Sequence, residues 1–160
     1  MSKKRILIIG ATGMAGHVIY SYLNNLKIYN LSTAVFRNKL TESCIIIDVT
    51  KRRDVCRLVN EIKPDFIINC VGVLVNGSSK NPDNAIFINA YFPHLLAKLA
   101  NGIGAKVIHI STDCVFSGFE GNYSEDALRN ADDIYGRSKA LGELKDNLNL
   151  TLRSSIIGPE

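Results

Sequence analysis

A tyrosine and a lysine four residues apart, Tyr135 and Lys139, form the side-chain pair in this sequence that is best suited to acid–base chemistry. On a helix, residues four apart lie on one face, so the phenol and the ammonium would be neighbours. A free phenol has a pKa of about 10 and is a poor base near neutrality. Because a nearby cation favours the phenolate, we expect Lys139 to lower the pKa of Tyr135.

A hydroxyl group is placed to act with this pair. The apolar run 107–110 predicts a strand that ends at Ser111 and Thr112. The Thr112 hydroxyl would then stand at the strand end, where it could hydrogen-bond a substrate oxygen beside Tyr135. In the alternative interpretation, Ser111 and Thr112 only satisfy backbone groups where the strand ends. The helix that carries Tyr135 and Lys139 follows this strand and favours the catalytic interpretation.

Three glycines spaced G-x-x-G-x-x-G follow the apolar run Arg5–Ile9 and precede a helix-like stretch. Glycines at such positions allow a sharp turn, close approach of the backbone to a pyrophosphate and tight packing of helix on strand. The helix start then offers free N–H groups and a positive dipole end to the phosphates. The pattern predicts a dinucleotide site with contacts from Gly10, Thr12, Gly13, Met14 and Gly16.

The end of the second strand bears on which dinucleotide is bound. A carboxylate there would bind the ribose hydroxyls of NAD, whereas this chain has Phe36-Arg37. A guanidinium matches a 2′-phosphate in charge and geometry, so Arg37 favours NADP(H), while NAD(H) remains possible. Asp48 and Val49, which close the third strand, are placed to contact the adenine. Asp48 could equally cap the following helix.

The small residues that end the fourth strand would let a cofactor lie close to the sheet. We therefore expect cofactor contacts from Cys70, Val71 and Gly72. We also expect them from Asn89, Tyr135 and Lys139, and Lys139 could hold the ribose and so fix the ring. Asn89, on the following helix, is a candidate for supporting Lys139 through water or backbone. It could also be an ordinary polar residue of that helix.

Short apolar runs alternate with amphipathic stretches along the whole chain. This order predicts an α/β fold, a doubly wound and mostly parallel sheet of about six strands with its ligands at the carboxyl ends. The expected strands are Arg5–Ile9, Leu31–Phe36, Cys44–Ile47, Asp65–Cys70, Lys106–Ile110 and Leu150–Ser154, and the expected helices cover 14–26, 51–63, 82–103 and 135–146. The irregular stretch Ser117–Asp133 predicts a functional loop beside Tyr135.

Composition excludes several classes of protein. The chain has 160 residues, 46% hydrophobic and 21% charged, which suits one globular domain over 1–160. The net charge of +4 comes from scattered rather than clustered cations, so we expect no nucleic acid. No apolar run approaches the ~20 residues of a membrane span, and the N-terminal run is too short for a secretory signal. The cysteines and histidines show no metal-ligand spacing, so we expect no metal. Because the secretory signal is lacking and most cysteines fall in or beside apolar, strand-like runs, we expect a cytoplasmic protein.

Four segments together resemble the extended short-chain dehydrogenases/reductases, and within them the dTDP-4-dehydrorhamnose reductase-like, sugar-nucleotide-modifying branch. They are ILIIGATGMAGH, KPDFIINCVG, STDCVFSG and IYGRSKALGE. The resemblance implies an NAD(P)-binding Rossmann fold and transfer of hydride from NAD(P)H to a keto carbon of a nucleotide-linked sugar. It also implies that Tyr135 protonates the forming alkoxide, Lys139 tunes Tyr135 and Thr112 holds the oxygen.

Other members of the superfamily remain alternatives. Related dehydratases carry Thr-Asp-Glu where this chain has Cys114 in the third position, which argues against dehydration. Epimerases share the Ser/Thr, Tyr and Lys and are not separated by these residues. A non-catalytic module similar to the methionine adenosyltransferase regulatory subunit is the other alternative. Family members are considerably longer, so we expect the C-terminal sugar-nucleotide-binding part to be missing from this chain. A homodimer is also possible.

Overall fold

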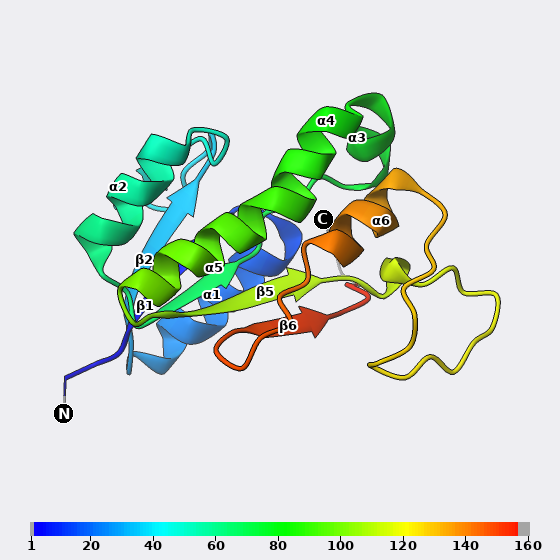
Figure 1. The fold of residues 1–160 in the computed structure, drawn as a ribbon. Coiled ribbons are helices and arrows are strands. Elements are labelled where there is room, and N and C mark those ends of the chain that lie inside the picture. Colours follow the sequence, from blue (N-terminus) through cyan, green and yellow to red (C-terminus); the bar gives the residue numbers. More distant parts are fainter. Residues whose placement is uncertain (1, 157–160) are drawn as a thin grey trace.

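The computed structural model describes residues 2–156 and contains one six-stranded parallel sheet in the order β3-β2-β1-β4-β5-β6 (Figure 1). This arrangement confirms the predicted doubly wound α/β fold. The strands are β1 (Arg5–Ile9), β2 (Asn30–Val35), β3 (Ile45–Ile46), β4 (Phe66–Asn69), β5 (Lys106–Ser111) and β6 (Leu150–Arg153). The order reverses direction between β1 and β4, which is where an open sheet of this kind forms a crevice at its carboxyl edge.

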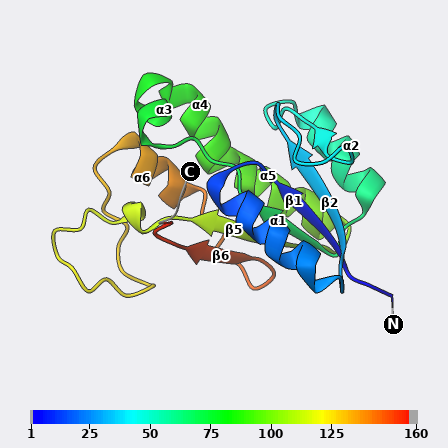
Figure 2. The same cartoon turned by 180° about the vertical axis from the view of Figure 1, so that it is seen from behind.

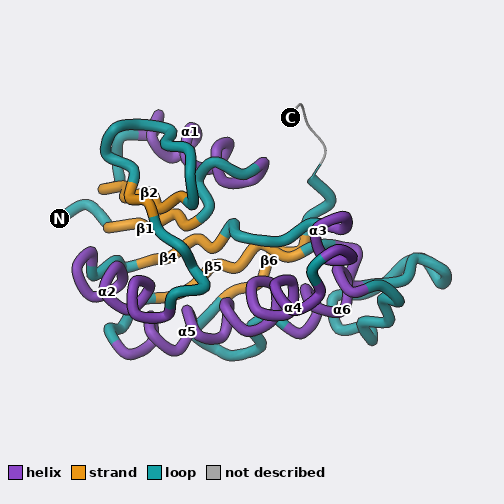
Figure 3. The backbone as a smooth tube through the Cα atoms, turned by 90° about the horizontal axis from the view of Figure 1, so that it is seen from above, coloured by secondary structure: helices purple, strands orange, loops and turns teal. Residues whose placement is uncertain are grey.

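Helices cover both faces of the sheet. Helix α1 lies alone on one face, and α2, α5 and α6 lie on the other (Figures 2 and 3). The helices are α1 (Met14–Leu26), α2 (Arg52–Ile62), α3 (Val75–Lys80), α4 (Pro82–Ala85), α5 (Phe92–Gly102) and α6 (Ile134–Leu141), together with the π-helical turn η1 (Ile86–Tyr91) and the 3₁₀ turn η2 (Asp113–Val115).

Burial on both faces explains why the central strands are continuously apolar. On the α2–α5 face, Leu7, Ile67 and Val107 of adjacent strands are fully buried in the larger core cluster. On the α1 face, Ile8 and Ile68 form the centre of the second cluster. At about 1.5–3 kcal/mol for each buried aliphatic side chain, these two layers fix the register of the sheet and thus the positions of the strand ends.

The helix expected over 82–103 is interrupted. Pro82 starts α4, the chain widens into the π-helical η1, and α5 then runs from Phe92 to Gly102. Helix α3 was not predicted from the sequence. π-Helical turns are rare and are often found at functional sites. Here the turn contains Asn89, whose fully buried side chain projects toward the end of α6.

Helix α6 ends at Leu141, five residues before the predicted end at 146. Gly142 follows, and a Cβ at this position would collide with the backbone of Asn89. The close approach of these two backbones requires the glycine and stops the helix. Likewise, the third predicted strand shrinks to Ile45–Ile46 at the sheet edge.

The segment 117–133 is irregular, as predicted, and extends beyond the end of the sheet near α6 and β6 (Figure 1). It is fastened at its start, where the rings of Phe116 and Tyr123 stack with centroids 4.5 Å apart. The Asn130 side chain accepts a hydrogen bond from Ser117 N, which ties the two ends of the segment together. Across the described part of the chain, every helix is too short or too polar to cross a bilayer.

Candidate functional site

A cleft of about 540 Å³ opens at the carboxyl edge of the sheet over β1, β2 and β4. We call it the glycine cleft. Its walls come from the ends of four strands and the loops that follow them. The lining includes Ile9, Gly10, Thr12, Gly13, Val35, Phe36, Asp48, Val49, Thr50, Cys70, Val71, Gly72, Asn84 and Ile88. Eight residues predicted from the sequence to bind a cofactor therefore lie on one surface.

The glycines of this cleft are required by its geometry. Gly10 has φ +82°, a conformation that disfavours side chains, and a Cβ there would lie 3.0 Å from the backbone of Cys70 and Val71. A Cβ on Gly16 would collide with the carbonyl oxygen of Gly10. Gly13 precedes α1 and has no side chain to cap it, so the helix start remains open to an anion. The cradle thus fits the pyrophosphate of a dinucleotide.

The predicted nucleotide-selecting residues differ in their placement. Arg37 is exposed, and its guanidinium lies over the Phe36 ring, 4.8 Å from the centroid, at the outer end of the cleft. Asp48 lines the cleft, but its carboxylate accepts hydrogen bonds from the backbone and hydroxyl of Thr50. These hydrogen bonds lower the pKa of Asp48. The Asp48 side chain therefore closes a turn with Thr50 and does not cap α2, whose N-cap is Lys51, so the helix-capping alternative is wrong. The position of Asp48 beside Val49 in the cleft still suits an adenine.

Thr112, Tyr135 and Lys139 come together over the end of β5, the strand next to β4. We call this group the catalytic corner. A Cβ on Gly136 would collide with the backbone of Cys114, so the glycine lets α6 pack closely on the turn after β5. Asp133 caps α6 by accepting a hydrogen bond from Gly136 N at 2.7 Å. These contacts bring the half-buried phenol of Tyr135 within hydrogen-bonding reach of Thr112.

The expected lowering of the Tyr135 pKa by Lys139 is not found within the chain itself. Burial raises the pKa of Tyr135, the hydrogen bond with Thr112 opposes this, and the charges of Cys114, Asp113 and Asp133 raise it further. Lys139 is not among the groups that shift this pKa, and its amine donates a hydrogen bond to the Ile110 carbonyl of β5. In this arrangement Tyr135 keeps its proton near neutrality and is suited to act as an acid.

Lys139 is almost completely buried, with 4% of its surface exposed. Its Nζ donates a hydrogen bond to the Ile110 carbonyl at 2.7 Å and lies 3.4 Å from His109 Nε2. Burial lowers the pKa of Lys139 to about 8, although Glu143 and Cys70 favour the charged form. Cys70, which lines the glycine cleft, thus connects the surroundings of Lys139 to the cofactor surface.

The polar contacts of the Asn89 side chain run to the loop after β4 and to α6, and its predicted roles toward the cofactor and Lys139 stay predictions. Its amide Nδ2 donates to the Val73 carbonyl at 2.9 Å and to Ser138 Oγ at 3.1 Å, and its Oδ1 accepts from Val73 N at 2.8 Å. Through these three hydrogen bonds, Asn89 clamps the loop after β4 to α6. It thereby holds the glycine cleft and the catalytic corner together.

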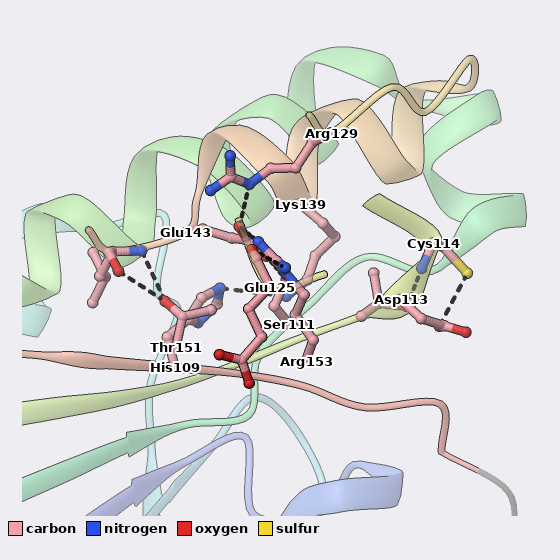
Figure 4. A network of polar contacts seen from close by, with 12 residues as sticks. His109, Ser111, Asp113, Cys114, Glu125, Arg129, Lys139, Glu143, Thr151 and Arg153 are labelled. Atoms are coloured by element: carbon pink, nitrogen blue, oxygen red, sulfur yellow. Dashed lines mark hydrogen bonds and ion pairs between the residues drawn. The ribbon is translucent and has the colours of Figure 1, made fainter. Parts of the chain in front are cut away.

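A buried network of ion pairs lies near the catalytic corner and was not predicted from the sequence (Figure 4). Glu143, just after α6, accepts hydrogen bonds from Arg129 at 2.5 Å, from Arg153 at 2.7 and 2.8 Å, and from Ser111 at 3.1 Å. Burial would raise the pKa of Glu143, but these donors outweigh it and lower the value. The network joins the 117–133 segment to β5, β6 and the end of α6. An arginine within a short apolar strand was the one signal available.

Comparison with known proteins places this arrangement in a family. The model of the RmlD substrate binding domain matches residues 4–151, which is most of the chain. The chain belongs to that family. The RmlD-like relationship agrees with the extended short-chain dehydrogenase/reductase resemblance of the four sequence segments.

Curated relatives of this RmlD-family chain carry two kinds of name. The dTDP-4-dehydrorhamnose reductase of Salmonella typhimurium is 32% identical over 146 residues, covering 89% of this chain and 47% of that protein. Methionine adenosyltransferase 2 subunit beta of Xenopus laevis is 30% identical over 141 residues, covering 88% of this chain and 42% of that protein. The chain thus spans less than half the length of these relatives.

A solved structure of this family superimposes closely. The dTDP-4-dehydrorhamnose reductase of Bacillus anthracis, determined in complex with NADP, has a TM-score of 0.82 and 33% identity. The match covers 96% of this chain and 54% of that protein. This chain therefore shares its fold with that reductase over the matched part.

Proposed function

We propose that this chain is the cofactor-binding and catalytic part of an NADP(H)-dependent reductase that acts on a nucleotide-linked 4-keto-6-deoxy sugar. The observation that carries the proposal is the position of the catalytic corner beside the glycine cleft. Thr112, Tyr135 and Lys139 lie over β5, and the cleft reaches the adjacent end of β4 through Cys70. The names of the reductase relatives support the class of substrate.

The residues of the glycine cleft fit the dinucleotide. The backbone near Gly10, Gly13 and Gly16 would hold the pyrophosphate at the start of α1. Arg37, at the outer end of the cleft, would pair with the 2′-phosphate. The bound complex of the Bacillus anthracis relative with NADP supports this choice of nucleotide. When bound, the reduced nicotinamide supplies the hydride.

In the catalytic corner, each side chain has a separate task. In this structure the Thr112 hydroxyl donates to Asp113 Oδ1 and accepts from Cys114 N. With substrate bound, its O–H would turn to the carbonyl oxygen of the sugar and hold it beside Tyr135. Tyr135 would donate its proton to the alkoxide that forms there, and its raised pKa keeps that proton in place beforehand. Lys139 would contribute positive charge as the phenolate develops.

The length of the relatives supports a division of labour. We propose that the sugar-nucleotide pocket is largely contributed by sequence outside residues 1–160, because the relatives match this chain over about half of their own length. A homodimer and a cytoplasmic location are further parts of the same proposal. Sedimentation of the purified protein over a concentration series tests the dimer.

A binding or regulatory module is the second candidate, and the similarity to methionine adenosyltransferase 2 subunit beta favours it. An epimerase is the third. The module would bind NADPH without consuming it. An epimerase would retain its nucleotide through purification and produce no net oxidation.

One assay separates these candidates. The protein, extended by whatever sequence follows it in its reading frame, is mixed with NADPH and a dTDP-4-keto-6-deoxy sugar, and loss of the reduced-nicotinamide absorbance is followed. The proposal expects consumption, and expects Tyr135→Phe to reduce it by at least about 10³-fold with little change in NADPH affinity. NADPH that binds but is never consumed would contradict the reductase proposal.

A further inference from the structure

His109 and Asn69 form a buried polar pair directly beneath Lys139, and neither was assigned a role above. Both are fully buried and lie opposite each other on the neighbouring strands β5 and β4. Asn69 Nδ2 lies 3.0 Å from His109 Nδ1, and His109 Nε2 lies 3.4 Å from Lys139 Nζ. Figure 4 shows His109 and Lys139 facing each other from β5 and α6.

The backbone fixes the orientation of the Asn69 amide. Val71 N donates a hydrogen bond to Asn69 Oδ1 at 3.2 Å. If the amide were reversed, Asn69 Nδ2 would face the N–H of Val71, and both donors would lack an acceptor in the interior. Asn69 therefore presents its Nδ2–H group to His109, and Nδ1 of the ring must accept.

That hydrogen bond sets the tautomer of His109. Burial lowers the pKa of His109 to about 3, so the ring is neutral and carries a single proton. Since Nδ1 accepts from Asn69, the proton resides on Nε2 and points toward Lys139 Nζ. An ammonium has only donors, whereas a neutral amine has a lone pair that can accept this N–H.

We propose that Asn69 and His109 are positioning residues that weaken the hold of Lys139 on its third proton: Asn69 locks His109 as the Nε2–H tautomer, and that N–H opposes the ammonium. The proposal deepens the proposed reductase and rests on it only for the role of Lys139. Val71 also lines the glycine cleft. The contacts from Val71 through Asn69 and His109 therefore connect the wall of that cleft to the Lys139 amine.

The other groups around Lys139 do not substitute for this pair. Glu143, past the end of α6, favours the ammonium. Cys70, after β4, favours it only when ionised, and burial raises the pKa of this thiol to about 12. Tyr135 lies one turn away on the same helix and retains its proton near neutrality. Of these neighbours, His109 is the one that aims an N–H at Nζ.

Two variants separate the N–H from the bulk of the ring. His109→Met keeps an unbranched side chain of similar size but has no donor, and His109→Gln places an amide N–H near the position of Nε2. We expect Met to raise the pKa of Lys139 by about one unit and Gln to leave it within a few tenths. The Lys139 side chain is titrated by NMR with isotope-labelled lysine, and thermal melts check that both variants fold.

The tautomer is measured directly in the unmodified protein by long-range ¹H–¹⁵N correlation of the labelled imidazole. A proton on Nε2 supports the proposal, and a proton on Nδ1 overturns it even if neither variant folds. Equal Lys139 pKa values in all three proteins, or equal rises in both variants, would also overturn it. Neither readout uses a sugar substrate, so failure of the reductase proposal would leave this test intact.

Discussion

The glycine cleft and the catalytic corner lie side by side but are built by different kinds of interaction. The cleft is shaped by backbone: Gly10 turns with positive φ, and Gly16 permits contact with the Gly10 carbonyl. The corner is shaped by buried side chains that pair across distant segments, with Lys139 over His109 and Glu143 between two arginines. Steric exclusion therefore maintains the first region, and charge pairing maintains the second.

This difference predicts different responses to mutation. A substitution of a cleft glycine should destabilise the fold through the volume of the added side chain, and this effect should not depend on pH. A substitution in the corner should act through charge and depend on pH. Two substitutions test this division and a third tests the choice of nucleotide in the cleft; each has a control, and the largest expected effect comes first.

Gly16→Val should have the largest effect. Its side chain would collide with main-chain atoms of Gly10 and Ala11 that cannot move without disrupting β1 and α1. We expect loss of more than about 4 kcal/mol of unfolding free energy, or no folded protein. Chemical denaturation measures the change, and NADPH binding to any folded fraction should be lost.

Gly102→Ala is the matched control for that substitution. Gly102 ends α5, and no atom lies within 4 Å of the position that its Cβ would occupy. Its stability should change by no more than about 0.5 kcal/mol. A comparable loss in both variants would remove the steric account of the cleft.

Glu143→Gln should have the second-largest effect, about 3 kcal/mol of unfolding free energy, because it leaves Arg129 and Arg153 without their buried carboxylate. The pKa of Glu143 is lowered in the fold, so its stabilising contribution exists above the unfolded pKa and disappears as the pH falls through the folded value. The difference between variant and parent should therefore shrink in acid. Urea titrations at several pH values measure it.

Glu125→Gln is the control for this charge change. Arg153 binds the backbone carbonyl of Glu125, and the Glu125 side chain is exposed. Its substitution should change stability by less than about 0.5 kcal/mol at any pH. A pH-independent loss at Glu143 would show that packing rather than charge maintains the corner.

Arg37→Ala should have the smallest effect on the fold and a selective effect on binding. Loss of a charged hydrogen-bond partner should weaken NADPH by about 10- to 100-fold and NADH by no more than about threefold. Lys39→Ala, which removes a neighbouring exposed cation, is the control. Equal losses of affinity for NADPH and NADH would show that Arg37 does not recognise the 2′-phosphate.

The sequence predicted the cleft better than the corner for a physical reason. The glycine spacing and the apolar strand before it are local signals, and the contacts that they specify are made by nearby backbone. The contacts of Asn89 could not be predicted from the sequence because its partners, Val73 and Ser138, come from segments far apart in the chain. The pKa of Tyr135 was expected to fall because the spacing placed Lys139 on the same helix face. That spacing did not reveal that the amine bends toward Ile110.

The most direct test of the account is the pKa of Tyr135 with and without NADP⁺, measured by NMR of ring-labelled tyrosine, with Tyr135→Phe identifying the signal. The account predicts a value above the ordinary value of about 10 for the protein by itself. It predicts a fall of about two units when the positively charged ring lies beside the phenol. A pKa that does not change on saturation with NADP⁺ would place Tyr135 away from the nicotinamide and contradict the account.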